Sequence, residues 1–519
     1  MINGTIEALI AITLVGSFVV MASSDRYAAK LATAWSLLPV GGSLYMWANF
    51  DGEKNALLDD GVLAFQSQET WLSLGPLPDI QWFVGVDGIS LPLIVLTTVL
   101  TTLALVSAWT PIDERQSQFF GLVLFLEAGL LGVFTALDFF VWFVFWEAVL
   151  VPMYFLIGIW GGPRRKYAAI KMFVYTNVAS LVMFIGFAAL VFGLGVDSFG
   201  LPAVTEASLN ANPAAETFFG VSVETLKVAA FFAMFAGFAV KVPVVPVHTW
   251  LPDAHVEAPT PVSVLLAGVL LKMGTYALLR FNFTMMPEVA TVNAPIIAAF
   301  AVVSIIYGAM LALAQSDLKR IVAYSSVSSM GYVILGLVAY TLYGVGGATF
   351  QMISHGLISG LMFMAVGVIY NTTHTRMVTD MSGMADKMPY TVGILIAGAF
   401  GYMGLPLMSG FAAEFYVFLG SFQATWGSGL VSAQVFTGLA MFGIVIVAGY
   451  LLFAMQRTLF GEFRLETDYE VGPAPLHDIA PLAALLIMII ALGVAPDIFF
   501  EMIKDATGPV ADLVSGGGA

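Results

Sequence analysis

The stretch Pro261-Val-Ser-Val-Leu-Leu-Ala-Gly-Val-Leu-Leu-Lys-Met-Gly-Thr-Tyr-Ala-Leu-Leu279 decides the fold. It is apolar or small at nearly every position and long enough to cross a hydrocarbon core of ~30 Å as a helix. Lys272 is the exception inside it, and Lys241 is the same exception inside the apolar run 228–247. A cation near the bilayer midplane costs about 2.5–3.5 kcal/mol, so ionisable residues within spans mark candidate functional sites.

The composition shows that the whole chain is as apolar as this stretch suggests. Of 519 residues, 59% are hydrophobic and only 10% are charged, whereas soluble proteins carry about 25% charged residues. Apolar runs of about 20 residues recur from end to end and do not alternate as barrel strands would. The sequence therefore predicts an all-α polytopic membrane protein. The first run, 5–22, lacks a signal-peptide pattern and is expected to remain as a helix.

Several classes of chemistry are excluded by what the chain lacks. It has no cysteine, which excludes thiolate-bound iron–sulfur clusters, attached c-type haem and disulfides. We find no dinucleotide-binding glycine motif and no Walker loop. The five histidines are too scattered to suggest a metal site. We expect no cofactor and no metal on this chain, and no nucleic-acid partner.

The net charge is −15, and the acidic residues lie mostly in predicted loops. Two explanations fit this excess equally well, a solvated surface of the kind found in halophiles and ordinary acidic loops. The second predicted loop alone contains Asp51, Glu53, Asp59, Asp60, Glu69 and Asp79.

Fourteen membrane spans are predicted from the apolar runs. With the N-terminus outside, thirteen of the 19 Lys and Arg residues fall in inner loops and four fall outside, as the positive-inside rule requires. An even number of spans places both termini outside a cell membrane. The predicted spans are 3–22, 31–49, 87–109, 117–136, 138–159, 167–195, 227–248, 260–280, 293–313, 320–341, 345–371, 389–421, 433–457 and 480–500.

A faint internal repeat divides the chain. Gly237-Phe-Ala-Val-Lys241 resembles Gly410-Phe-Ala-Ala-Glu414 at a separation of 173 residues, and spans 4 and 9 begin 176 residues apart. The matching offsets indicate five-helix units at spans 4–8 and 9–13, inverted in the membrane because five is odd. Such short matches also arise by chance in apolar chains. The predicted domains are residues 1–110, 117–280, 293–457 and 480–519.

Spans 7 and 12 are predicted to be broken helices. Pro243 and Pro246 follow Lys241, and Pro406 precedes Glu414. Proline removes a helix hydrogen bond and clashes with the preceding turn. Freed backbone groups at membrane depth are tolerated beside protein or water. A packing kink is the alternative, but a break beside an ionisable group in both units favours a hydrated polar path.

Five ionisable residues form a candidate proton path along these spans. Glu147 lies roughly 14 Å into span 5 and Lys272 about 16 Å into span 8 at 1.5 Å per residue. Lys241 is the natural partner of Glu147, with a purely structural ion pair as the alternative. Histidine titrates near neutral pH, so His355 is a relay candidate, or else a satisfied bundle residue. Glu414 is the last of these five residues along the chain, and we call the five the ionisable row.

Three further residues are weaker candidates. Glu127 is an intramembrane carboxylate in span 4 with less context. His248 and His255 flank the inner end of span 7, where they form the cytoplasmic mouth of a proton path or cap helices.

Residues 248–280, which begin His248-Thr-Trp-Leu-Pro-Asp-Ala-His255, closely resemble the signature of subunit M of proton-pumping NADH–quinone oxidoreductase, respiratory complex I. Its mitochondrial counterpart is chain 4. Matches elsewhere cover nearly the whole chain, including Val86-Asp-Gly-Ile-Ser90 and Asp317-Leu-Lys-Arg-Ile-Val-Ala-Tyr-Ser-Ser326.

The resemblance implies fourteen spans, two inverted units and proton transfer through Glu147, Lys241, Lys272, His355 and Glu414. A glutamate at the last position is typical of subunit M, since subunits L and N usually carry lysine there. The implied partners are L- and N-type subunits, with flavin, iron–sulfur clusters and quinone held by other chains. The chain ends too soon after span 14 for the long lateral helix of subunit L.

Two alternative functions stay open at this point. One is a subunit of a multisubunit Na⁺/H⁺ antiporter or a membrane-bound hydrogenase, and the other is a purely structural membrane subunit. The sequence leaves open the electron donor, the quinone, the choice of H⁺ or Na⁺ and the number of protons moved.

Overall fold

The computed structural model describes residues 4–52, 55–58, 63–73, 75, 77–426 and 431–515. Glu53, Asp59 and Asp60 of the predicted acidic loop lie outside the described residues.

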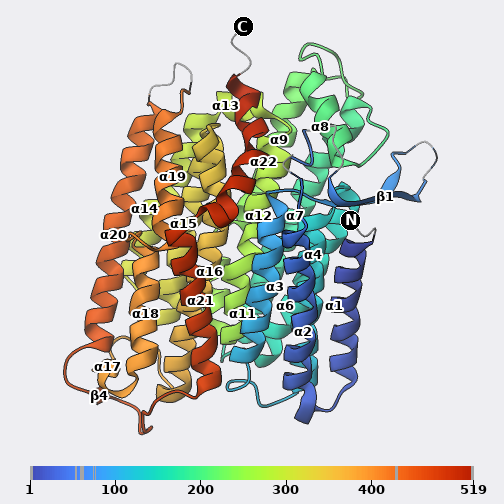
Figure 1. The fold of residues 1–519 in the computed structure, drawn as a ribbon. Coiled ribbons are helices and arrows are strands. Elements are labelled where there is room, and N and C mark those ends of the chain that lie inside the picture. The colour runs from blue at the N-terminus through green and yellow to red at the C-terminus, as the bar shows by residue number, and fades with distance from the viewer. Residues whose placement is uncertain are drawn as a thin grey trace.

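The chain forms a bundle of long helices that run side by side (Figure 1). Within the described ranges, twelve helical stretches are long and apolar enough to cross a membrane, which confirms the predicted all-α polytopic class. They are α1 (Thr5–Ala22), α3 (Ser90–Ser107), α4 (Gln116–Thr135), α5 (Phe139–Ala148) with α6 (Leu150–Trp160), α7 (Arg165–Leu194), α9 (Val223–Lys241), the stretch α11 (Thr260–Leu265), η1 (Leu266–Leu270), α12 (Leu271–Ala277) and η2 (Leu278–Phe283), α14 (Ala294–Leu313), α15 (Leu318–Val338), α16 (Leu342–Thr373), α20 (Ala433–Leu459) and α21 (Leu476–Val494).

The two remaining predicted spans are also helical. Span 2 is α2 (Asp25–Ala48), whose composition is more polar than that of the twelve. Span 12 is two shorter helices, α18 (Pro389–Tyr402) and α19 (Ser409–Gln423), with the predicted break between them. Each predicted span thus coincides with helix, while the count of fourteen membrane crossings stays a prediction.

Short elements that the sequence did not reveal connect the long helices. Strand β1 (Ala64–Leu72) pairs antiparallel with β2 (Ile80–Val86) in the predicted acidic loop, and this hairpin projects from the side of the bundle (Figure 1). Besides its acidic residues, this loop contains aromatic and β-branched residues, which favour strands. The others are α8 (Leu201–Asn210), α10 (Trp250–Glu257), α13 (Pro287–Val292), α17 (Met384–Lys387), and β3 (Met381–Ser382) paired with β4 (Arg464–Leu465).

The tail predicted after span 14 is a helix, α22 (Asp497–Ser515). Phe500 and Ile503 are buried against the bundle, while Glu501 and Asp505 are exposed, the pattern of an amphipathic surface helix. In Figure 1 it runs along the outside of the bundle toward the end where α8 and α13 lie.

The centre of the bundle is the contact between the α11–η2 stretch and α16. Every residue from Thr260 to Phe283 is buried. The two segments cross at glycines, because a Cβ added to Gly356 would lie 2.8 Å from the Gly268 carbonyl oxygen. This backbone approach brings the middle of span 8 against the middle of span 11.

Candidate functional site

Lys272 and His355 meet at this central crossing. Lys272 Nζ lies 2.7 Å from His355 Nδ1 and donates to the Ala267 carbonyl at 2.5 Å. Lys272 is 0% exposed and His355 is 1% exposed. The sequence placed both residues at depth without indicating that they touch. An amine and an imidazole in direct contact can exchange a proton without intervening water.

A π-helical turn, η1, ends two residues before Lys272. Such turns are rare and occur frequently at functional sites. The Ala267 carbonyl that receives the Lys272 ammonium lies within this turn. The sequence did not predict this turn, because no proline marks it.

Lys241 is the last residue of α9, and its side chain is buried. The helix α9 therefore ends seven residues before the predicted limit of span 7 at residue 248, since Pro243 and Pro246 cannot continue the helix. The break itself is where it was expected. Lys241 Nζ lies 5.2 Å from the centre of the Trp146 ring, within the range of a cation–π interaction.

Glu147 is the penultimate residue of α5 and is partly exposed. It accepts a hydrogen bond of 3.2 Å from Asn177 Nδ2. Glu147 and Lys241 interact electrostatically, but among the described residues they form no direct ion pair. Glu147 and Lys241 therefore interact without direct contact, and Lys241 contacts the Trp146 ring instead.

Glu414 lies on α19, just after the break between α18 and α19. It is buried, and its Oε2 atom has no hydrogen-bond partner. A Cβ on Gly404, whose φ is +62°, would lie 2.5 Å from that oxygen. The backbone of the break at Gly404 therefore lies close against the Glu414 carboxyl group.

The weaker candidates are buried, and none of them is hydrogen-bonded to Lys272 or His355 among the described residues. Both carboxyl oxygens of Glu127 lack a hydrogen-bond partner. His255, on α10, stacks on Phe363 with ring centres 4.4 Å apart, and neither ring nitrogen is paired. His248 precedes α10 and packs edge-on against Tyr307 and Tyr324.

Three polar residues near these groups were not predicted. Lys319, which we counted with an inner loop, is buried and donates to the Ala258 carbonyl at 2.6 Å. Asn177 holds Glu147, and Tyr402 packs against the His355 ring with centres 5.8 Å apart. Each is brought in by a different helix, so no spacing along the chain could reveal it.

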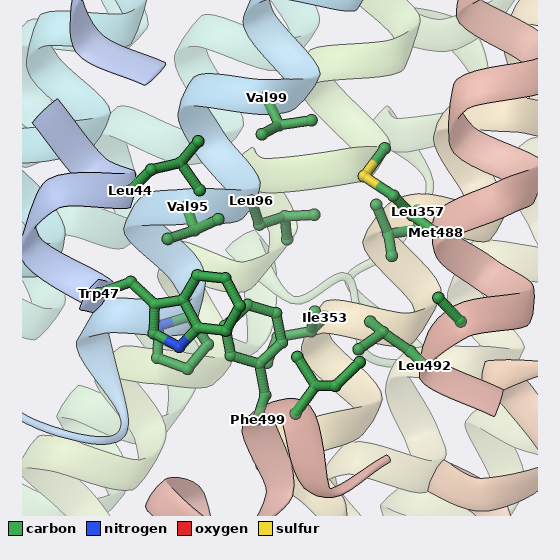
Figure 2. Close-up of a pocket in the computed structure, with 13 residues that line it drawn as sticks. Leu44, Trp47, Val95, Leu96, Val99, Ile353, Leu357, Met488, Leu492 and Phe499 are labelled. Carbon is green, nitrogen blue, oxygen red and sulfur yellow. The ribbon is translucent and has the colours of Figure 1, made fainter. Parts of the chain in front are cut away.

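No group of three or more His, Asp or Glu side chains that could hold a metal occurs in the described ranges. A cavity of about 220 Å³ lies between α2, α3, α16, α21 and the start of α22 (Figure 2). Leu96, Ile353 and the other lining residues are all hydrophobic. None of the five ionisable residues of the candidate proton path lines this cavity.

Residues 136–440 match the family described as NADH:quinone oxidoreductase/Mrp antiporter, TM. The chain belongs to this family. Its family membership and its twelve apolar helices make it a multi-pass membrane protein.

Curated relatives match over nearly the full length. The chain is 39% identical over 498 residues to NADH-quinone oxidoreductase subunit M of Rhodobacter capsulatus, covering 95% of this chain and 91% of that one. It is 39% identical over 468 residues to an NAD(P)H-quinone oxidoreductase chain 4 of Synechococcus elongatus, covering 90% and 83%. It is 36% identical over 497 residues to F(420)H(2) dehydrogenase subunit M of Methanosarcina mazei, covering 95% of each.

Solved structures share the fold. A chain of respiratory complex I from Thermus thermophilus with bound NADH aligns with a TM-score of 0.84 and 25% identity, covering 98% of this chain and 99% of that one. A chain of the Mrp complex from Dietzia sp. aligns with a TM-score of 0.79 and 20% identity, covering 99% and 98%.

Proposed function

We propose that this chain is a proton-translocating membrane-arm subunit of a complex I-type oxidoreductase, moving protons through buried Glu, Lys and His side chains. The observation that carries the proposal is the buried Lys272–His355 contact. Two helix breaks lie near the other charged members of the path, since Lys241 is the last residue of α9 and Glu414 is the sixth residue of α19. The names of the curated relatives support the same assignment, as subunits of quinone oxidoreductases or of a dehydrogenase.

The chemistry assigned to the row is proton transfer between side chains. A proton enters at the Glu147–Lys241 end, and Lys272 then passes one from its ammonium to His355 Nδ1. That step leaves a neutral amine on Lys272 and an imidazolium on His355, so charge is conserved. Glu414 accepts the proton at the far end. Flavin, iron–sulfur clusters and quinone belong to other subunits, whose redox chemistry drives these transfers.

The inverted units are residues 117–280 and 293–457, flanked by helices of residues 1–110 and 480–519. L- and N-type subunits are the neighbours, in a cell membrane with both termini outside. NADH is the proposed donor, and F(420)H(2) is a second donor class named among the relatives.

An Na⁺/H⁺ antiporter subunit is the second candidate, because the family description includes Mrp antiporters. The Mrp complex shares only 20% identity with this chain, which supports the fold alone. The relatives at 36–39% identity carry oxidoreductase or dehydrogenase names, and they favour the first candidate.

The test uses Lys241→Met and Glu147→Gln in the assembled complex. Each removes an ionisable group and nearly keeps its volume, so we expect donor-driven proton uptake into vesicles to fall at least about tenfold. Lys227→Met is the matched control, since Lys227 is also a buried lysine but pairs with Glu288 at 2.7 Å outside the row. Undiminished uptake in both test variants would instead indicate a purely structural subunit.

A further inference from the structure

Four buried polar atoms without a hydrogen-bond partner gather around the end of α18. They are His355 Nε2, Tyr402 Oη, Tyr450 Oη and Glu414 Oε2. Each comes from a different helix: α16, α18, α20 and α19, respectively. A buried polar group left unpaired costs about 1–3 kcal/mol, so four in one region indicate a polar space that water can enter.

Tyr402 connects this region to the central contact. It is the last residue of α18 before the break, and its ring packs edge-on against the His355 ring. His355 uses Nδ1 for Lys272, which leaves Nε2 as its second proton-transfer atom. The Tyr402 hydroxyl is therefore a neighbouring group that can take over a proton leaving His355.

Serine hydroxyls on two other helices face the Tyr402 oxygen without bonding to it directly. Ser325 and Ser326 on α15 each donate to the Val322 carbonyl, at 2.7 and 3.3 Å, and Ser359 on α16 donates to the Gly356 carbonyl at 3.3 Å. Each serine oxygen also has acceptor lone pairs besides these bonds. These acceptors can orient water beside Tyr402.

Tyr450 and Glu414 are the other two members of this group of four polar residues. Tyr450 on α20 is fully buried and lies close to Ser325, Tyr402 and Glu414. Tyr332 borders the same space, but its hydroxyl is committed to the Ala440 carbonyl at 3.3 Å. Tyr402 and Tyr450 are therefore the tyrosines here whose hydroxyls have no fixed partner in the described ranges.

We propose that the hydroxyls of Tyr402 and Tyr450, joined by water, carry the proton between His355 and Glu414. The proposal rests on the proposed function and assigns two residues to the part of the path that the ionisable row leaves open. Neither tyrosine matches any position predicted from the sequence.

The transfer leaves both tyrosines neutral. His355 Nε2–H gives its proton to the Tyr402 oxygen, directly or through water, as the Tyr402 O–H proton leaves toward Tyr450. Tyr450 repeats the exchange, and the Glu414 carboxylate receives the final proton. One N–H bond breaks and one carboxyl O–H bond forms, and each hydroxyl must then rotate before the next proton passes.

The experiment compares Tyr402→Phe, Tyr450→Phe and the double variant in the assembled complex. Phenylalanine keeps the ring and removes only the relay oxygen. We expect the double variant to lower donor-driven proton uptake at least about tenfold, to the level of Lys272→Met, and to abolish the solvent deuterium effect on uptake through this subunit. A packing defect would not change the deuterium effect.

Tyr340→Phe is the matched control, because Tyr340 is buried and bonds the Phe283 carbonyl at 2.7 Å away from the row. It should retain uptake. Uptake that stays normal in the double variant but falls in Lys272→Met overturns the tyrosine relay alone. Uptake that stays normal in Lys272→Met as well overturns the proposed function. If Tyr402→Phe prevents assembly, Tyr450→Phe decides between the same outcomes.

Discussion

Gly268 on η1 and Gly356 on α16 meet backbone to backbone, and this approach sets Lys272 against His355. Both glycines lie within one turn of a member of the pair. The Leu96 side chain packs on the outer side of Gly356, where an added Cβ would lie 2.7 Å from its Cδ2 atom. At Gly356 an added Cβ would also lie 2.8 Å from the Gly268 carbonyl oxygen, so no larger side chain fits there without moving a helix.

The first prediction concerns Gly356→Ala. The new methyl group meets the Gly268 carbonyl, which is backbone and cannot swing aside, so α16 and η1 should separate. We expect a loss of about 1–3 kcal/mol in stability and a several-fold fall in proton uptake, because the 2.7 Å contact lengthens. Thermal unfolding and vesicle uptake assays measure both. Gly438→Ala, with nothing within 4 Å of its Cβ, should change neither, and an equal loss there would count against the explanation.

The second prediction concerns Gly404→Ala in the α18–α19 break. An L residue in a left-handed conformation costs about 1–2 kcal/mol, and its methyl group would displace the Glu414 carboxyl. Uptake should therefore fall more than stability does. Gly393→Ala is the control on the same helix pair, since its Cβ meets nothing within 4 Å. Normal uptake in Gly404→Ala would show that the position of Glu414 is not critical.

The sequence predicted the long helices because each is a run of apolar residues of the length that a bilayer requires. It also predicted the break after Lys241 and the break before Glu414, since Pro243 and Pro406 act locally. Lys272 and His355 were predicted as isolated polar residues at depth. These features could be predicted because they depend on hydropathy and proline, whose effects are set by residues close together in the sequence.

The other features of the candidate site depend on contacts between helices, which the spacing of residues along the sequence does not reveal. Lys272 and His355 are 83 positions apart in the sequence and are brought together by a glycine crossing. The indole of Trp146 at Lys241, and Asn177 at Glu147, replace the direct ion pair that charge alone suggested. Tyr402 sits in an apolar run and gave no signal, since tyrosine is common in packed helices.

The third prediction concerns the buried ion pair between Arg280 and Asp87, whose atoms lie 2.6 Å apart. Asp87 lies in the turn between β2 and α3. Burial opposes its ionisation, but the Arg280 charge and hydrogen bonds from Arg280, Ala56 and Ser90 outweigh this, so the pKa of Asp87 is below its ordinary value of 3.8. Asp87→Asn should cost about 3–5 kcal/mol by leaving the guanidinium without its charge partner.

The lowered pKa also fixes how this stabilisation depends on pH. It is fully present above the unfolded-state value of 3.8 and is lost as pH falls through the lower folded-state value. The deficit of Asp87→Asn should therefore be constant from about pH 5 to about pH 8 in thermal unfolding of the detergent-solubilised complex. A deficit that shrinks within that range would contradict the assignment. Arg320→Gln, which breaks a partly exposed 3.4 Å pair with Asp253, should cost at most about 1 kcal/mol.

The most direct test of proton transfer through this chain is the number of protons taken up per donor oxidised by vesicles that contain the Lys272→Met complex. Methionine nearly keeps the length and volume of lysine but cannot hold a proton, so His355 loses its 2.7 Å partner. We predict an assembled complex whose donor-driven proton uptake falls at least about tenfold. An assembled Lys272→Met complex with the wild-type proton yield and rate would contradict the account.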